Sequence, residues 1–292
     1  MATATAPAAP TVVTTDPGVA PSDIPEGVSE CCLRGFLHEG TPAGSVIKVG
    51  GLDTYLATSE AGETDKAVVL IHDVFGWGIP NPRLIADRIA KDGGYRVYVP
   101  DFFNGDAPNV GLLEKFLTKP KSFMDRLSAT GSMFLGAPSF MAWLGRHRDE
   151  ATVPLLDAVF KDLRENHGVK RIGAIGYCWG GRYVVLAGIR GLADVIVPTH
   201  PSQINIDEDI PKVLDKPTLY CLSETDNRFP PESVAKTKAL YAATPGGSKA
   251  EFITYPGTEH GFAVRGDLMD DVARKAALKA VADQIAFFKT HL

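Results

Sequence analysis

Residues 171–181 read RIGAIGYCWGG, and this stretch decides which fold we expect. An apolar run, Arg171–Ile175, leads into a Gly-rich turn, and a helical pattern continues from Trp179 to about Ile189. The turn has the spacing of the G-x-S-x-G nucleophile elbow, with Cys178 in the serine position. In such an elbow the nucleophile projects above a sheet at a helix N-terminus, which favours a thiolate. The alternative is a small buried cysteine beside glycines that only the turn requires.

Strand-like and helical patterns alternate along the rest of the chain. Strands are expected at 51–57 (closing a hairpin with 46–48), 67–71, 96–99, 171–175, 194–197, 218–222 and 251–255. Helices are expected at about 82–91, 121–135, 137–147, 153–166 and 179–189. This order predicts an α/β fold with a mostly parallel central sheet and helices on both faces. In the last helix, an apolar stripe is expected to face the core: Leu278, Val281, Ile285, Phe288 and Leu292.

An acid and a histidine follow two later strands, in the order that the elbow arrangement expects. Glu224 and Asp226 come after the strand at 218–222, and His260 comes after the strand at 251–255. Ligands bind outside the carboxyl ends of the strands in sheets of this kind. We favour Asp226 as the acid because it lies farther into its loop, and Glu224 is the competing candidate.

These motifs resemble those of the dienelactone hydrolase family, and its fungal-type members most. Besides the elbow, the resemblance rests on IHDVFGW at 71–77, VPDFF at 99–103 and HGF at 260–262, and it covers roughly residues 30–292. It implies an α/β-hydrolase fold and a carboxylic ester hydrolase of the carboxymethylenebutenolidase kind, acting on small esters or lactones. It further implies a triad of Cys178, Asp226 and His260, with a thioester acyl-enzyme. The backbone N–H groups of Val74 and Trp179 would form the oxyanion hole, and no cofactor or metal is required.

The resemblance is less complete where the substrate would bind. Bacterial members have a Glu at the position of Asp73 that holds the resting thiol, and Asp73 is one methylene shorter. It is expected either to gate the thiol or to bond the backbone of its own turn. Those members hold a substrate carboxylate with two arginines. Arg265 lies close to the position of the one that follows the histidine, whereas residues 101–107, where the other would lie, contain no arginine. An apolar pocket suited to a larger or less anionic ester is expected from four aromatic residues: Phe75, Trp77, Phe103 and Phe262.

Length, composition and charge narrow the remaining possibilities. The 292 residues have a net charge of −5, which argues against partners such as nucleic acids or membrane surfaces that call for a basic patch. Residues 1–28 are rich in Ala, Thr and Pro and are predicted to be a disordered tail before a single domain at 29–292. The oligomeric state is left open.

Cysteine usage predicts a reducing, cytoplasmic location. Four cysteines are too few for a disulfide framework in a chain of this length, and none forms a Cys-x-x-Cys pair for zinc. Two alternatives to the dienelactone reading stay open. One is a general carboxylesterase or thioesterase without dienelactone activity, and the other is a non-catalytic ligand-binding or thiol-redox protein in which Cys178 is a sensor.

Overall fold

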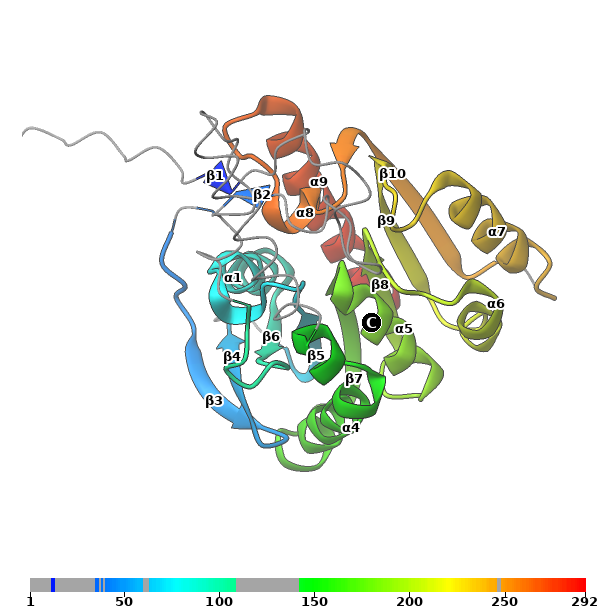
Figure 1. Ribbon diagram of the computed structural model, residues 1–292. Helices are drawn as coiled ribbons and strands as arrows, with labels where there is room; N and C mark the ends of the chain where they lie inside the picture. Colours follow the sequence, from blue (N-terminus) through cyan, green and yellow to red (C-terminus); the bar gives the residue numbers. More distant parts are fainter. Residues whose placement is uncertain are drawn as a thin grey trace, which may run out of the picture.

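An eight-stranded sheet runs through the middle of the computed structural model, which describes residues 12–13, 35–36, 38, 40–59, 63–108, 142–245 and 248–292 (Figure 1). The order of its strands is β10-β9-β8-β7-β5-β6-β4-β3. Their bounds are β3 (Ser45–Val49), β4 (Leu52–Ala57), β5 (Glu63–Ile71), β6 (Tyr95–Pro100), β7 (Arg171–Tyr177), β8 (Val195–Thr199), β9 (Thr218–Thr225) and β10 (Ala250–Glu259). A separate short pair joins β1 (Val12–Val13) to β2 (Gly35–Phe36).

The sheet is mostly parallel, as predicted. Strands β6, β5, β7, β8, β9 and β10 run in one direction, whereas β4 pairs antiparallel with β6 and β3 pairs antiparallel with β4. The predicted hairpin is present, and Gly50 and Gly51 close it with φ values of 57° and 86°. Positive φ at both central residues is what a two-residue hairpin turn requires, and glycine adopts it without strain.

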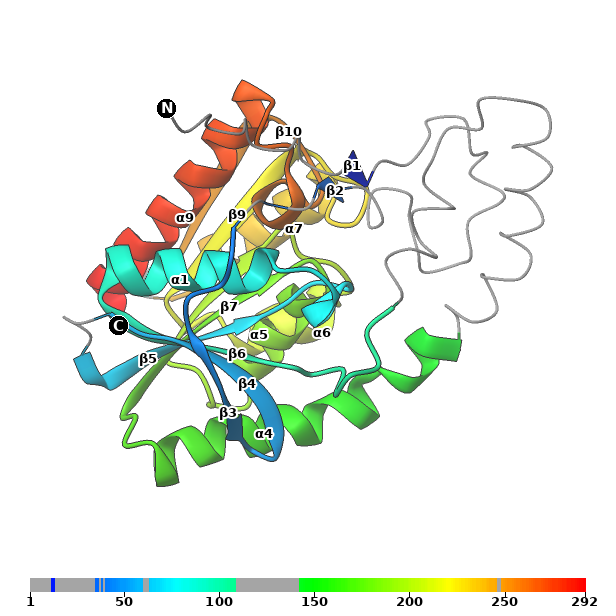
Figure 2. The same ribbon diagram turned by 90° about the vertical axis from the view of Figure 1, so that its left-hand side faces the viewer.

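Helices cover both faces of the sheet (Figure 2). One face packs against α1 (Asn81–Gly93) and α9 (Asp271–His291), and the other packs against α4 (Asp149–Asn166) and α5 (Trp179–Ile189). The remaining helical segments are shorter or lie near β9 and β10: η3 (Gly76–Gly78), α6 (Ile206–Asp209), η4 (Ile210–Lys212), α7 (Pro231–Ala242) and α8 (Phe262–Arg265). None of the helices in the described ranges is long and apolar enough to cross a membrane.

Strand β5 is the point from which the chain winds in both directions. Its neighbours are β6 on one side and β7 on the other, and the chain continues from β5 and β7 into helices on opposite faces of the sheet, α1 and α5. The carboxyl ends of β5, β7, β8, β9 and β10 therefore meet at one edge of the sheet, which is where an open α/β sheet binds its ligands.

The elbow depends on a close approach that only glycine permits. A Cβ at Gly180 would lie 2.3 Å from the carbonyl oxygen of Ile71, and one at Gly176 would lie 2.1 Å from that of Gly180. Strand β5, strand β7 and the first turn of α5 are thus packed backbone against backbone. The two glycines fix the height of residue 178 above the sheet.

We predict that Gly180→Ala lowers the free energy of unfolding by about 1–3 kcal/mol or more, because the added methyl group must push backbone atoms apart. Urea unfolding of the purified variant measures the effect. Gly145→Ala is the matched control, since a Cβ there meets no atom within 4 Å, and its stability should stay at or above that of the natural protein. Equal stability of the two variants would contradict the proposed packing.

Several expectations differ from the structure or fall outside it. Leu278 does not face the core, since 43% of its surface is exposed. Helix α9 instead buries a face centred on Ala277, Val281 and Phe288, and Leu278 lies about 100° around the helix from Ala277. The N-terminal tail predicted for 1–28 lies outside the described residues apart from Val12–Val13. Of the two helices expected between 121 and 147, only residues 142–147 are described, and 142–146 are helical.

Candidate active site

Cys178 occupies a strained turn between β7 and α5. Its backbone angles are φ 52° and ψ −110°, which residues with a side chain rarely adopt. The side chain is buried, and Sγ lies 3.9 Å from Oγ of Ser202. Trp179 is the first residue of α5, and the first N–H groups of a helix have no partner within it. The turn therefore presents a thiol to backbone N–H groups that favour negative charge.

The predicted histidine and acid are in direct contact. Nδ1 of His260 lies 2.9 Å from Oδ2 and 3.0 Å from Oδ1 of Asp226, and both side chains are buried. A carboxylate can only accept hydrogen bonds, so Nδ1 holds the hydrogen. In the neutral ring this leaves Nε2 as the nitrogen that can take a proton. The contact thus selects the tautomer that a general base needs.

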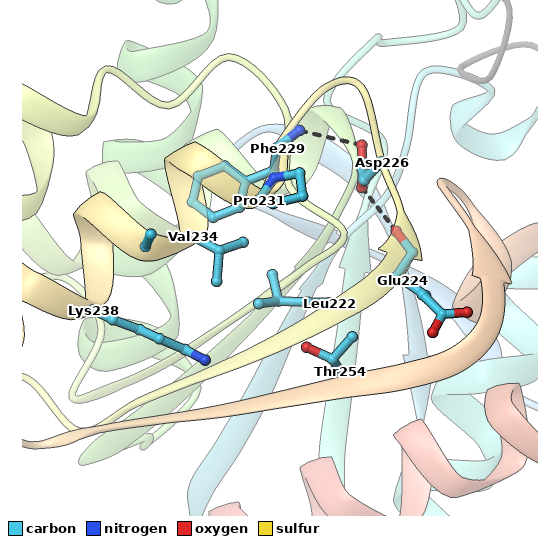
Figure 3. A pocket seen from close by; sticks show the side chains of 10 residues that line it. Leu222, Glu224, Asp226, Phe229, Pro231, Val234, Lys238 and Thr254 are labelled. Carbon is cyan, nitrogen blue, oxygen red and sulfur yellow. Dashed lines mark hydrogen bonds between the residues drawn. The ribbon is translucent and has the colours of Figure 1, made fainter.

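Three further donors hold the carboxylate of Asp226. Ser223 donates from Oγ at 2.9 Å, and the backbone N–H of Phe229 donates at 3.2 Å (Figure 3). The backbone N–H of Arg228 donates at 2.8 Å. Burial raises the pKa of Asp226, but the hydrogen bond from His260 and these donors outweigh burial, and the net pKa lies below the ordinary value. Asp226 is therefore ionised throughout the neutral range.

Glu224, the competing acid, is directed elsewhere. Its side chain is exposed, and Oε2 accepts a hydrogen bond from the backbone N–H of Gly257 at 2.9 Å. Figure 3 shows it turned toward β10, away from Asp226. A pocket of about 280 Å³ lies beside this loop between β9, β10 and α7, with Asp226 in its wall and Lys238 at α7. Among the two acids of the loop, only Asp226 contacts His260.

Asp73 forms a buried ion pair with Arg265 across the loops after β5 and β10. Nε of Arg265 donates to Oδ2 of Asp73 at 2.5 Å, and the two side chains are 2% and 0% exposed. Oδ1 of Asp73 accepts a hydrogen bond from the N–H of Phe75 at 3.1 Å. Asp73 therefore bonds the backbone of its own turn, which is one of the two expected roles. The guanidinium lies 4.9 Å from the ring of Phe75. The charge of Arg265 is thus already balanced inside the protein.

Phe103 belongs to an aromatic stack above β5, β6 and the elbow. Its ring lies 4.5 Å from that of His72 and 4.8 Å from that of Trp179. His72 in turn stacks on Trp179 with ring centroids 5.7 Å apart, and its Nε2 accepts from the N–H of Phe102 at 3.3 Å. Burial lowers the pKa of His72, which keeps the ring neutral. His72 therefore packs between the rings of Phe103 and Trp179.

The other aromatic candidates lie on the α1 and α9 side of the sheet. Phe262 packs against the ring of His200 at 5.6 Å. Trp77 is only partly buried, and the guanidinium of Arg83 from α1 covers its ring at 5.5 Å. Phe262 therefore lies against the His200 ring that contacts His260, whereas Trp77 lies toward α1.

A sequence model of the dienelactone hydrolase family matches residues 52–292, a range that contains every residue of the candidate site. The chain belongs to the dienelactone hydrolase family. It is accordingly a carboxylic ester hydrolase with the α/β-hydrolase fold, as the resemblance of its motifs implied.

Fungal hydrolases are similar to the chain along most of their length. The hydrolase pyvD of Aspergillus violaceofuscus is 33% identical over 90% of this chain and 97% of its own. Dienlactone hydrolase 1 of Gibberella moniliformis is 31% identical over 82% of this chain and 85% of its own. A putative dienelactone hydrolase from Klebsiella pneumoniae has the same fold, with a TM-score of 0.56 at 18% identity over 79% of this chain and 91% of that one.

A second site would have to use the remaining cysteines or other possible metal ligands. Cys221, the other cysteine within the described ranges, is buried in β9, and burial raises its pKa to about 12. Cys31 and Cys32 lie outside the described residues. Where the structure describes the chain, no group of three or more His, Cys, Asp or Glu side chains is placed to hold a metal ion.

The sequence reasoning missed the loop at residues 200–203. It follows β8 and places His200 against His260, with ring centroids 5.1 Å apart, and Ser202 against Cys178. Its place follows from the order of the strands in the sheet, because β8 lies between β7 and β9 and a side chain just after it stands between Cys178 and Asp226. Nothing in the loop matches a known catalytic motif, so it drew no prediction.

Proposed function

We propose that this member of the dienelactone hydrolase family hydrolyses small esters or lactones through a Cys178–His260–Asp226 triad. The observation that supports the proposal most is the pairing of His260 with a buried, ionised Asp226 at the same sheet edge as the elbow cysteine. The pairing provides a base in the correct tautomer, and the elbow provides a nucleophile in a strained turn.

The reaction begins when Nε2 of His260 takes the proton of the Cys178 thiol. Sγ then forms a bond to the carbonyl carbon, and the carbonyl oxygen becomes an oxyanion. The N–H groups of Val74 and Trp179 donate to that oxygen, and each donor of this kind contributes about 3 kcal/mol to the transition state. The carbon–oxygen bond breaks as His260 returns the proton to the leaving alkoxide, which leaves a thioester. In a lactone the alkoxide stays attached to the acyl group.

Hydrolysis of the thioester uses the same residues in reverse order. His260 removes a proton from water as the water oxygen attacks the thioester carbon, and the oxyanion forms again. The carbon–sulfur bond then breaks, the thiolate takes the proton back from His260, and the acid product leaves. Asp226 stays ionised and balances the positive charge of His260 in both halves. No step calls for a cofactor, and a small molecule is the partner that this chemistry needs.

A general carboxylesterase without dienelactone activity is the second candidate, and one observation favours it. Arg265 is paired with Asp73 and lies over Phe75, and residues 101–107 supply no second arginine. A substrate carboxylate would have to share Arg265 with Asp73. We keep the dienelactone substrate class because the site retains one buried arginine beside the triad. We also infer a cytosolic location, because the cysteines in the described ranges are free thiols.

A substrate pair tests this choice. We expect kcat/KM for an anionic dienelactone to lie within about tenfold of that for its neutral methyl ester, since one charge-assisted contact partly offsets desolvation of the carboxylate. The double variant Asp73→Asn/Arg265→Gln removes both charges without leaving either one buried and unpaired. It should raise KM for the anion about tenfold and change KM for the neutral ester less than about threefold.

Steady-state kinetics on both substrates provides the measurement. A natural protein that turns over the neutral ester and leaves the anionic dienelactone untouched would overturn the dienelactone substrate class and support the general carboxylesterase. Equal changes in KM for both substrates in the double variant would show that Arg265 does not recognise the carboxylate.

A further inference from the structure

The backbone of the nucleophile is clamped by the chain that follows β8. The N–H of Cys178 donates to the carbonyl of Thr199 at 3.1 Å, and the N–H of Ser202 donates to the carbonyl of Cys178 at 3.0 Å. Cys178 is thus held on both sides in its strained conformation by one short segment. Strained residues persist where their surroundings over-determine them, and such residues cluster at functional sites.

The segment is itself tightly fixed. His200 and Gln203 have φ values of 34° and 61°, and the N–H of His200 donates to the carbonyl of Cys221 at 2.7 Å. Pro201 packs so closely on α5 that a Cβ at Gly181 would lie 2.6 Å from it. A loop with two positive φ values and these contacts has little freedom to move.

An ion-pair network ties the loop to its surroundings. Arg182 of α5 donates to the carbonyl of Gln203 at 2.8 Å and pairs with Asp209 at 3.1 Å. Asp209 accepts in turn from the N–H of Asn205 at 2.8 Å. Nε of the same guanidinium donates to both carboxylate oxygens of Asp149 in α4. The residues after β8 are therefore fixed relative to α5, the helix that begins at the nucleophile.

Two side chains of this loop contact two different catalytic groups. Oγ of Ser202 lies 3.9 Å from Sγ of Cys178, and Ser202 is 3% exposed. The ring of His200 meets that of His260 edge-on, with centroids 5.1 Å apart at 68°, and Phe262 supports it at 5.6 Å. A single rigid loop thus touches the thiol through one side chain and the base through another.

His200 is an unusual residue for a purely structural role. Its ring is fully buried, and neither nitrogen has a hydrogen-bond partner within the part of the chain that the structure describes. Burial is the main cause of a pKa well below the ordinary value, and the neighbouring His260 and Arg265 lower it further while Asp226 opposes them. A neutral ring beside His260 supports it without adding a second positive charge when His260 is protonated.

We propose that the loop at 200–203 is a positioning element of the active site, in which Ser202 orients the thiol of Cys178 and His200 supports the ring of His260. The proposal rests on the triad chemistry described above. Ser202 donates its hydroxyl hydrogen to the thiolate that forms when His260 takes the proton, and a hydrogen bond to the charged form favours that form. His200 limits rotation of the His260 ring, which keeps Nε2 in one place.

The test labels Cys178 with iodoacetamide at a series of pH values and measures the product by peptide mass spectrometry. Ser202→Ala should move the midpoint of the labelling curve up by about half a pH unit or more, because the thiolate loses a donor. With a neutral aryl ester, kcat should fall about tenfold and KM should change less than about twofold. Ser233→Ala, on α7, is the matched control and should leave the midpoint and both constants unchanged.

Two variants of His200 test the second contact. His200→Ala leaves space beside His260 and should lower kcat about tenfold with KM nearly unchanged. His200→Phe keeps a ring there and should restore kcat to within about threefold, with a melting temperature no lower than that of the natural protein, since two buried nitrogens without a protein partner are removed. His291→Ala, at the end of α9, is the control for loss of an imidazole.

The two sets of results separate this proposal from the triad itself. Labelling needs no ester, so an unshifted midpoint in Ser202→Ala together with full kcat in His200→Ala overturns the positioning role whatever the substrate is. A His200→Phe variant as slow as His200→Ala would contradict support by ring packing. Failure of the triad proposal is a different observation, namely ester turnover that survives Cys178→Ala.

Discussion

Replacing Cys178 with alanine should lower kcat/KM for a neutral aryl ester by about 10⁴-fold or more, because no other group can form the covalent bond to the carbonyl carbon. The geometry offers no substitute at the elbow, since the turn at φ 52° projects a single side chain above β7. The melting temperature should change little, because the exchange removes one sulfur atom. Steady-state kinetics and thermal unfolding of the same preparation provide the measurement.

Cys221→Ala is the matched control for that experiment. Cys221 is the other thiol within the described ranges, lies in β9 and is kept protonated by burial, which raises its pKa to about 12. Its loss should leave kcat within about twofold of the natural value. Activity that persists in Cys178→Ala would show that another group is the nucleophile, whereas a natural protein that turns over no ester would favour the non-catalytic thiol-redox or ligand-binding role.

Asp226→Asn should lower kcat about 10³- to 10⁴-fold, the effect that an analogous exchange has in the Ser-His-Asp triad of a protease. An amide NH₂ facing Nδ1 of His260 moves the hydrogen to Nε2, and the ring can no longer accept the thiol proton. The pKa of Asp226 is held below its ordinary value in the folded protein. Its contribution to stability is therefore complete above the ordinary carboxyl pKa and is lost as the pH falls through the lower folded value.

Both halves of that prediction have a direct measurement. The kcat of Asp226→Asn is compared with that of Glu224→Gln, whose parent side chain is exposed and bonds Gly257, and which should lie within about threefold of the natural protein. The difference in unfolding free energy between the natural protein and Asp226→Asn should shrink below about pH 4. A large loss of kcat in Glu224→Gln together with a natural kcat in Asp226→Asn would show that the acid has been assigned to the wrong residue.

The fold was open to prediction because its signals are local. A continuous apolar run such as Ala67–Ile71 is typical of a strand covered on both faces, and the glycines around Cys178 are dictated by backbone contact. Asp226 was separable from Glu224 by position in the loop, and the structure places only Asp226 against His260. Order along the chain and spacing were sufficient for these features.

Features that depend on packing between distant segments were not predictable in the same way. Leu278 fits the helical period of its neighbours, yet the small side chains of Ala276 and Ala277 define the face that α9 turns inward. The pairing of Asp73 with Arg265 joins residues 192 positions apart, and no spacing rule connects them. The loop at 200–203 has the same character, since its role comes from where β8 lies in the sheet.

The central claim is that an acyl group is transferred to Cys178, and trapping that thioester tests it most directly. The protein would be mixed with an excess of a slowly hydrolysed aryl ester, quenched in acid within the first turnover and digested for peptide mass spectrometry. We expect one acyl group per chain, on the peptide that contains Cys178, and none on Cys178→Ala. An acyl group on another residue, or a burst of released alcohol with Cys178 unmodified, would contradict it.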